Sequence, residues 1–295
     1  MTTFVRIVEA GSISKAAEQL GVAKSGVSRR LAELENRLGV RLLNRTTRRS
    51  SLTEAGRSYY EGAVKLLSDL AELDAQVTGC ETALAGRLRL AAPLSFGLAH
   101  LAPALEEFMR THPEILVDID FSDRQIDLVA QGVDLAIRIA ELRDSSLKAR
   151  RLCPIRLVLC ASPRYLERHG APASAEQLSA HQVLLYDIGG GSALRLGDGR
   201  GGEVMLPVRP RLVANNGDFL RDIAIAGHGI ALLPTFICWQ ALAMGDLVPL
   251  LPECWPAPLN AHAVWPQSRF LAARARRFID FLAERFGQNP YWDQL

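Results

Sequence analysis

The chain has 295 residues, of which 48% are hydrophobic and 22% charged, and its net charge at pH 7 is +2. This composition is typical of folded globular proteins and excludes extensive disorder and collagen-like structure, while the length suggests two folded units or one long one. No stretch reaches the roughly 18 consecutive apolar residues that a membrane span requires. The first residues also lack the charged-then-apolar layout of a secretory signal. We therefore expect a cytoplasmic protein that does not enter a membrane.

The charge is distributed unevenly along the chain. Residues 1–58 contain 11 Lys/Arg against 5 Asp/Glu, residues 59–86 contain 1 against 5, and residues 87–295 contain 22 of each sign. A basic block beside a neutral body is typical of a nucleic-acid-binding module attached to a larger domain. Charge alone leaves open a simple solvated basic face, so the residue pattern has to decide.

Three short helices are predicted within the first 39 residues. The first carries an apolar stripe before Gly11, and the second runs over 15–20, with Ser12 or Ser14 as its cap and Gly21 at its end. The third begins near Lys24 and places four apolar residues on one face: Val27, Leu31, Leu34 and Leu38. Two helices joined by a turn of about three or four residues form a helix-turn-helix.

The opposite face of the third helix presents Ser25, Arg29 and Ala32, with Ser28 at its side. Short polar side chains and an arginine on the N-terminal half of such a helix suit entry into the major groove of DNA. This face is the candidate base-reading surface.

A hairpin is predicted next, from two short extended segments at 40–43 and 50–52 around a basic tip at 44–49. Threonine and arginine side chains in such a wing suit contacts to DNA phosphates beside the groove. Thr53 is the expected cap of the long helix that follows.

This N-terminal segment resembles the helix-turn-helix of LysR-type transcriptional regulators. The resemblance rests on four motifs: GSISKAAEQLGVAKSGVSRRL at 11–31, LE at 34–35, LGVRLLNRTT at 38–47 and LTEAG at 52–56. It implies base or phosphate contacts from the third helix and the wing by the following residues: Lys24, Ser25, Ser28, Arg29, Arg45, Thr47, Arg48 and Arg49.

Two residues of the third helix depart from the family pattern. Ala23 stands where the family usually has Ser or Thr, so the helix lacks a side-chain cap worth roughly 1 kcal/mol. Gly26 adds an interior glycine, which costs about 0.5–1 kcal/mol relative to alanine.

A long helix with an unbroken heptad seam is predicted from about Thr53 to Ala85, with a length of roughly 50 Å. Its seam follows alternating spacings of 4 and 3: Tyr59, Ala63, Leu66, Leu70, Leu73, Val77, Cys80 and Leu84. The alternative is a core helix inside a single domain. Pairing with a second copy also suits recognition, because a twofold dimer reads two half-sites.

Residues 87–295 alternate strands and helices, which indicates α/β units and a mostly parallel sheet. Strands are expected at 87–91, 115–121, 135–139 and 151–161, and helices up to 111, at 126–131 and at 272–286. A second set runs from 162 to 260, with a capped start at 174–177 and a glycine-rich hairpin loop at 189–202.

This order resembles the regulatory domain of the same family, two Rossmann-like lobes similar to periplasmic solute-binding proteins. The segments that carry the resemblance are APLSFG at 92–97, DLAIRI at 134–139, LCASP at 159–163, NNGD at 215–218 and GIALLP at 229–234. The resemblance implies two crossing strands, near 159–161 and 261–264. The expected domains are 1–57 (DNA binding), 58–86 (linker and dimerisation) and 87–295 (effector binding). Within the last, lobe I takes about 87–160 and 264–295, and lobe II about 161–263.

A ligand site is expected where strand ends meet helix N-termini between the lobes. A hydroxyl, an amide, helix N–H groups and an arginine suit a small molecule that bears a carboxylate. The candidate effector residues are Ser95, Phe96, Ser122, Arg138 and Asn216. Two of them have structural alternatives: Arg138 could pair with Asp134 or Glu141, and Asn216 could simply cap a helix.

Other chemistry finds little support in the sequence. The G-x-G at 227–229 lacks a third glycine, no G-x-S-x-G motif occurs, and the six histidines show no metal spacing. Five cysteines form no C-x-x-C pair, so neither a disulfide framework nor a zinc knuckle is indicated. Cys153 and Cys160 lie in apolar strand sequence, where cysteine is usually inert, although some family members sense oxidants through a cysteine pair.

The sequence thus predicts a multidomain chain: an N-terminal all-α winged helix-turn-helix, a long coiled-coil linker helix and an α/β two-lobed, periplasmic-binding-protein-like domain. We interpret it as an effector-responsive LysR-type regulator that binds double-stranded DNA as a homodimer or homotetramer. It is expected to need no metal or cofactor and to have no enzymatic activity. The alternative is a two-lobed solute-binding or enzymatic protein whose N-terminal helices only mediate oligomerisation.

Overall fold

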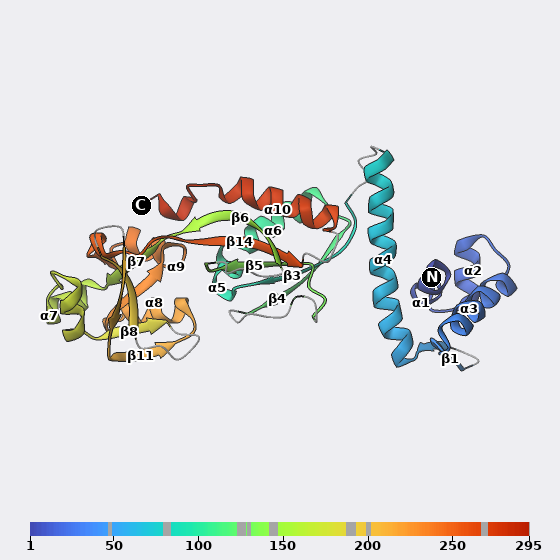
Figure 1. Cartoon of the computed structure of the whole chain (residues 1–295), viewed down its shortest axis with the longest axis horizontal. Helices are drawn as coiled ribbons and strands as arrows, with labels where there is room; N and C mark the ends of the chain where they lie inside the picture. The colour runs from blue at the N-terminus through green and yellow to red at the C-terminus, as the bar shows by residue number, and fades with distance from the viewer. Residues whose placement is uncertain are drawn as a thin grey trace. The chain divides into compact units, whose positions relative to one another are not determined.

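The computed structural model describes residues 1–46, 49–78, 84–122, 128, 131–141, 147–186, 193–198, 202–266 and 271–294. The chain divides into two compact units, Met1–Thr82 and Ala83–Leu295 (Figure 1).

The first unit contains the three predicted helices, a hairpin and a long helix. In chain order these are α1 (Thr2–Ala10), α2 (Ile13–Leu20), α3 (Lys24–Leu38), β1 (Leu43–Thr46), β2 (Arg49–Leu52) and α4 (Glu54–Thr78). Ser12, rather than Ser14, caps α2 by accepting a hydrogen bond from the backbone N–H of Lys15. The first wing strand begins at Leu43, later than the expected 40–43, because residues 40–42 form the connection after the left-handed Gly39.

The core of this unit forms where the apolar faces of the three short helices meet. Phe4, Ile7, Val27 and Leu31 are buried there, and the small side chain of Ala16 lets α2 approach its neighbours closely. The rings of Tyr59 and Tyr60 on α4 pack edge-on against Phe4, with ring centroids 5.7 and 6.5 Å away. Aromatic contacts therefore attach the start of α4 to the helix-turn-helix.

The predicted heptad seam is divided between two environments. Tyr59 and Ala63 pack against the unit's own core, whereas Leu66 and Leu70 are 59% and 53% exposed. The helix is described as far as Thr78, and Cys80 lies outside the described residues. The seam does not extend to Leu84, which lies outside any helix, just before a strand, and packs on the core of the second unit.

The second unit contains two five-stranded sheets. The sheet that defines the first lobe has the order β4 (Ile115–Phe121), β3 (Gly86–Ala92), β5 (Leu135–Ile139), β14 (Leu259–Pro266) and β6 (Leu147–Ile155). Its helical segments are α5 (Leu94–Phe96), the π-helix η1 (Gly97–Leu101), α6 (Ala102–Thr111), α10 (Ala273–Phe286) and the 3-10 turn η4 (Tyr291–Asp293).

The sheet that defines the second lobe has the order β11 (Pro210–Ala214), β8 (Val183–Tyr186), β12 (Ile230–Pro234), β7 (Leu157–Ala161) and β13 (Val248–Leu250). Its helical segments are α7 (Pro163–His169), η2 (Ala175–Ala180), α8 (Gly217–Ile225), α9 (Thr235–Ala243) and η3 (Pro252–Cys254). The glycine-rich segment contributes the antiparallel hairpin of β9 (Ala193–Gly197) and β10 (Glu203–Pro207). The predicted helical start at 174–177 is a 3-10 helix, and the predicted helix at 126–131 lies almost entirely outside the described residues.

Both sheets are mixed, which corrects the expectation of mostly parallel strands. β3 pairs in parallel with β4 and β5, and β8 with β11 and β12, whereas β14 and β7 are antiparallel to their neighbours. These two antiparallel strands follow the two passages of the chain between the sheets. A chain that enters a sheet from its neighbour need not make the crossover that parallel pairing requires.

The chain passes from the first sheet to the second at Arg156, between β6 and β7, and returns between β13 and β14. The segments 159–161 and 261–264, expected to cross, therefore lie inside the second and the first sheet. The lobe limits expected at 160 and 264 move accordingly to 156 and to the 251–258 connection. The segment 151–161, expected to be one strand, is divided at Arg156 between β6 and β7. A single arginine interrupts the apolar run through 152–161, so the residue pattern alone indicates one strand.

Candidate DNA-binding surface and effector cleft

The candidate base-reading side chains lie on the exposed face of α3. Lys24, Ser25 and Arg29 are exposed and Ser28 is half-buried, because Val27 and Leu31 turn the opposite face of the helix into the core. Arg29 forms an i,i+4 ion pair with Glu33, at 3.6 Å and with side chains 78% and 66% exposed. Such an exposed pair contributes little to stability, so Arg29 remains available to a partner.

The wing is an antiparallel hairpin in which Arg45 pairs with Ser50 and Thr46 with Arg49. Arg45 and Arg49 thus lie on its two strands, close to the tip. Thr47 and Arg48 of the predicted set lie outside the described residues.

Sequence reasoning missed how the hairpin is fixed to the helices. The buried carboxylate of Glu35 on α3 accepts hydrogen bonds from the backbone N–H groups of Leu42 and Leu43, at 2.8 and 3.2 Å. The Thr53 hydroxyl donates to the carbonyl of Arg41 at 2.7 Å and accepts from the N–H of Gly56 at 2.9 Å, which confirms Thr53 as the cap of α4. Both residues belong to motifs of the family resemblance, but only the structure shows that they set the position of the wing.

The start of α3 has the weakness that the sequence predicts. Ala23 occupies the N-cap position and has no side-chain group that could bond the first turn. Gly26 lies in that turn, and a Cβ added to it would meet no atom within 4 Å.

Two of the candidate effector residues connect the lobes. Ser95 is buried in α5, directly after β3, and the Asn216 side-chain amide donates to its hydroxyl at 3.4 Å. The side-chain oxygen Oδ1 of Asn216 caps α8 by accepting from the backbone N–H of Phe219 at 2.9 Å. Asn216 is therefore both a helix cap and a link between the first and second lobes.

Two further candidates lie at the ends of the strands that flank β3. Ser122 follows β4, and Arg138 lies near the end of β5. The N–H of Ser122 donates to the carbonyl of Ala92 at 3.0 Å, which places Ser122 beside the segment that leads to Ser95. The strand β5 is parallel to β3. Burial lowers the pKa of the Arg138 guanidinium, so removal from water already opposes its charge and a nearby anion would relieve that cost.

His262 is a polar residue of this region that sequence reasoning missed. It lies directly opposite Arg138 in the β14–β5 pairing, so the two side chains share one face of the sheet. Its buried Nδ1 atom has no hydrogen-bond partner among the described residues. Burial is also the largest of the causes that lower the pKa of His262, which keeps the ring neutral at pH 7. The available signal is its position in a strand in which the only other polar residue is Asn260.

The Phe96 side chain does not line the cleft, contrary to expectation. Its ring is completely buried and packs edge-on against Phe236, Phe286 and Trp292 at centroid distances of 5.4, 5.4 and 5.9 Å. An aromatic residue next to a predicted pocket serine belongs here to the core.

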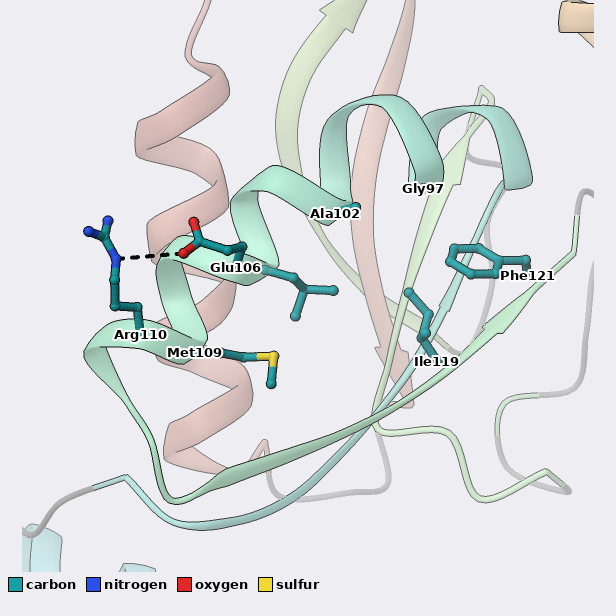
Figure 2. A pocket seen from close by; sticks show the side chains of 8 residues that line it. Gly97, Ala102, Glu106, Met109, Arg110, Ile119 and Phe121 are labelled. Carbon is teal, nitrogen blue, oxygen red and sulfur yellow. Dashed lines mark ion pairs between the residues drawn. The ribbon is translucent and has the colours of Figure 1, made fainter.

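A groove lies elsewhere in the first lobe, between α6 and β4. It has a volume of about 600 Å³ and is lined mainly by apolar groups, with the Glu106–Arg110 ion pair at its rim (Figure 2). Gly97 and Phe121 form one end of the groove. The Phe121 ring lies where any side chain larger than that of Gly97 would have to be. None of the candidate effector residues lines it.

The structure also bears on metal binding and on the cysteines. No group of three His, Cys, Asp or Glu side chains in that part of the chain could hold a metal ion. Cys153 and Cys160 are completely buried, and burial raises the pKa of the Cys153 thiol to about 12. Reactive cysteines need an accessible thiolate, and neither of these two thiols is accessible in the folded domain. No described helix is both long and apolar enough to cross a membrane.

Comparisons with known proteins agree with this architecture. Residues 1–57 match the family described as "Bacterial regulatory helix-turn-helix protein, lysR family", and residues 81–287 match "LysR substrate binding domain". CrgA, an HTH-type transcriptional regulator of Neisseria meningitidis serogroup C, is 38% identical over 291 residues, which cover 98% of this chain and 97% of CrgA.

Two solved structures extend the likeness to the whole chain. CrgA, described as a LysR-type transcriptional regulator from Neisseria meningitidis, has a TM-score of 0.64 at 37% identity, with 97% of this chain and 98% of CrgA covered. AphB, a Vibrio cholerae virulence activator of the LTTR family, has a TM-score of 0.61 at 31% identity, with 96% and 97% covered.

A helix-turn-helix with an exposed basic face, joined to a two-lobed α/β domain, defines a DNA-binding transcriptional regulator. The chain belongs to the LysR family of these regulators and carries that family's substrate-binding domain. The comparisons give no support to a free-standing solute-binding protein or enzyme.

Proposed function

We propose that α3 enters the major groove of duplex DNA with Lys24, Ser25, Ser28 and Arg29, while Arg45, Thr47, Arg48 and Arg49 of the wing contact phosphates. The observation that carries this proposal is the exposure of Ser25 and Arg29 opposite the buried stripe of α3. Arginine reads guanine by a bidentate contact, which discriminates between bases by about 1–3 kcal/mol.

We infer that two copies pair through the part of α4 beyond its contacts with α1. Leu66 and Leu70 are exposed leucines on one heptad seam, as expected of a helix that pairs with another chain. A dimer or a pair of dimers would present two recognition helices to a partly palindromic site. The matched ranges and the extent of α4 support a DNA-binding part at 1–57, a linker at 58–86 and an effector-binding part at 87–295.

We propose that a small carboxylate-bearing molecule binds between the lobes and is sensed rather than converted, in the cytoplasm where the target DNA lies. Ser95 and Ser122, the N-terminus of α8 at Asn216, and Arg138 supply hydroxyl, N–H and cationic groups at the ends of strands from both lobes. Binding would bias DNA occupancy if the ligand had different affinities for two lobe arrangements.

The DNA proposal is tested by capturing genomic fragments with the full-length protein and measuring their affinity by gel shift. We expect the Arg29→Ala variant to lose sequence-specific binding by roughly 10- to 100-fold, the equivalent of a lost base contact. Arg6→Ala is the matched control, because Arg6 is also an exposed arginine in an intrahelical ion pair of the same unit, with Glu9 at 3.0 Å. Equal affinities of the wild type and both variants would refute the assignment of α3.

A further inference from the structure

The last turn of the chain lies at the junction of the two lobes. η4 follows α10 of the first lobe and packs against α9, which continues from β12 of the second lobe (Figure 1). Sequence reasoning ended at Phe286 and assigned no role to this turn.

Asp293 accepts hydrogen bonds from Arg156, where the chain crosses between the sheets, and from Thr235 in the second lobe. Its carboxylate accepts from the guanidinium of Arg156, the residue at which the chain passes between the sheets. It also accepts from the hydroxyl of Thr235 at 2.5 Å, and the N–H of Thr235 donates to the carbonyl of Arg156 at 2.9 Å. The Asp293 side chain is only 6% exposed and that of Arg156 is 42% exposed, so the carboxylate is shielded from water while the guanidinium stays partly solvated. Hydrogen bonds to an ionised group such as this carboxylate are stronger than neutral ones.

Trp292 and Tyr291 contact His100 in the first lobe. The Trp292 ring is completely buried, at centroid distances of 4.3 Å from His100 in the first lobe and 6.4 Å from Phe236 at the start of α9. His100 bonds both sides: its Nε2 lies 3.0 Å from the carbonyl of Phe236 and its Nδ1 2.5 Å from the Tyr291 hydroxyl. Because a carbonyl only accepts, Nε2 must carry the proton, and Nδ1 then accepts from Tyr291.

The C-terminal turn also contacts the segment that carries the candidate effector residue Ser95. Trp292 packs against the ring of Phe96, and the neighbouring Ser95 receives the interlobe hydrogen bond of Asn216. One short turn therefore contacts the crossover residue, the first turn of α9 and the segment that bears the cleft serine.

We propose that Tyr291–Asp293 is an interlobe strut that fixes the angle between the two lobes through the Asp293 carboxylate and the Trp292 ring. A change of lobe angle has to break the Asp293 bonds or displace Trp292. A ligand in the cleft can therefore change the lobe angle only by changing the contacts of the strut. This last step rests on the proposed effector site.

The test is hydrogen–deuterium exchange of the full-length protein, read in peptides that cover 155–161 and 233–240. The Asp293→Asn variant keeps the shape of the side chain but loses its charge. We expect it to raise exchange at the Thr235 amide and the start of α9 at least tenfold, which equals about 1.4 kcal/mol of local opening free energy. The core strands β3 and β8 should keep their wild-type protection.

Asp280→Asn is the matched control. Asp280 on α10 also pairs with an arginine, Arg150 on β6, but both partners belong to the first lobe. This variant should affect exchange around β6 and α10 and leave the peptides at 155–161 and 233–240 unchanged. The single variant Arg156→Gln removes the other partner of the Arg156–Asp293 ion pair. The double variant, Arg156→Gln with Asp293→Asn, should show amide exchange no faster than the faster of the two single variants, because both substitutions remove the same ion pair.

Three results would overturn the proposal. They are unchanged exchange at Thr235 in Asp293→Asn, an equal rise throughout the domain, and an equal rise at the junction in Asp280→Asn. None of these readings uses an effector. A failure of the cleft assignment would leave the exchange result intact and is therefore distinguishable from a failure of the strut.

Discussion

At the scale of single residues, conformation and burial decide what each motif position can tolerate. Gly26 and Gly56 are both helical glycines of the DNA-binding unit, yet their surroundings differ. A Cβ on Gly26 would meet open space, whereas a Cβ on Gly56 would lie 1.9 Å from the carbonyl oxygen of Leu42. The glycine in the LTEAG motif is therefore required by a close approach between α4 and the chain that leads into the wing.

We predict opposite effects for the two glycine-to-alanine substitutions. Gly26→Ala should raise the free energy of unfolding by about 0.5–1 kcal/mol, because alanine is the better helix former and nothing obstructs its methyl group. Gly56→Ala should lower it by more than about 1 kcal/mol, since the backbone of Leu42 has to move. Urea denaturation followed by circular dichroism measures both values. A loss of stability in Gly26→Ala would contradict this account of α3.

His100 gives the interlobe region a dependence on pH. Burial is the largest cause that lowers the pKa of His100, and it outweighs the opposing effects of the Phe236 carbonyl and of Asp218. In the unfolded chain a histidine takes up a proton near pH 6.5. As the pH falls below that value, the unfolded state binds the proton first, so stability decreases until the lower folded-state pKa is reached.

The His100→Gln variant should therefore lose stability less steeply than the wild type as the pH falls from about 6.5 to 5.5. The difference in slope cannot exceed about 1.4 kcal/mol per pH unit, the value for one proton. Denaturant titrations at several pH values measure this slope. His228→Gln, at an exposed histidine, is the control, and an identical slope in all three proteins would refute the assignment.

At the scale of elements, periodicity predicted most helices and strands, and packing partners decided the rest. The 4-3-4 spacing of α3 correctly placed Val27, Leu31 and Leu34 in the core. The same kind of spacing in α4 could not distinguish Ala63, which packs within its own chain, from Leu66, which does not. The pattern reports which face is apolar, but not what covers it.

We predict that the double variant Leu66→Asp with Leu70→Asp is monomeric. Two carboxylates on the exposed part of the seam would have to be buried without partners in a paired helix. Light scattering should report the mass of a single chain with unchanged helix content, where the wild type is expected to give the mass of two or four chains. Met244→Asp adds a carboxylate at an apolar residue that is 70% exposed in the second lobe and should leave the mass unchanged. A dimer that survives the double variant would exclude α4 as the pairing element.

At the scale of the whole molecule, the order of elements and the family resemblance predicted the architecture, but not the passages between the lobes. Arg156, where the chain passes between the sheets, lies within an apolar run and gives no sign of a strand end. The mixed pairing of β7 and β14 depends on how distant strands are connected, which a local residue pattern does not predict. The cleft candidates Ser95 and Asn216 were predicted from strand ends, and the structure brings them within 3.4 Å. The roles of Phe96 and of the C-terminal turn depend on contacts between distant segments, such as His100 with Tyr291, and no local signal marks them. For His262 the only local signal is a histidine within a mostly apolar strand.

The effector cleft leads to a prediction at this scale. Ser95→Ala should weaken the thermal shift caused by a small carboxylate that stabilises the wild type, while basal DNA binding stays unchanged, because Ser95 lies in the second compact unit. Ser162→Ala removes another buried hydroxyl, at the far end of β7, and is the control. A ligand response in Ser95→Ala equal to that of both the wild type and the control would contradict the placement of the cleft.

We propose that two α3 helices, held as a pair, read two stretches of one DNA site. Hydroxyl-radical footprinting of the full-length protein on a captured genomic fragment is the decisive experiment. We expect two protected patches whose centres are separated by a whole number of helical turns of about 10–10.5 base pairs. Protection should be lost in Arg29→Ala and reduced to weak, independent half-sites in the double leucine variant. A single unpaired patch, or the same footprint in Arg29→Ala, would show that the two helices do not read DNA as a pair.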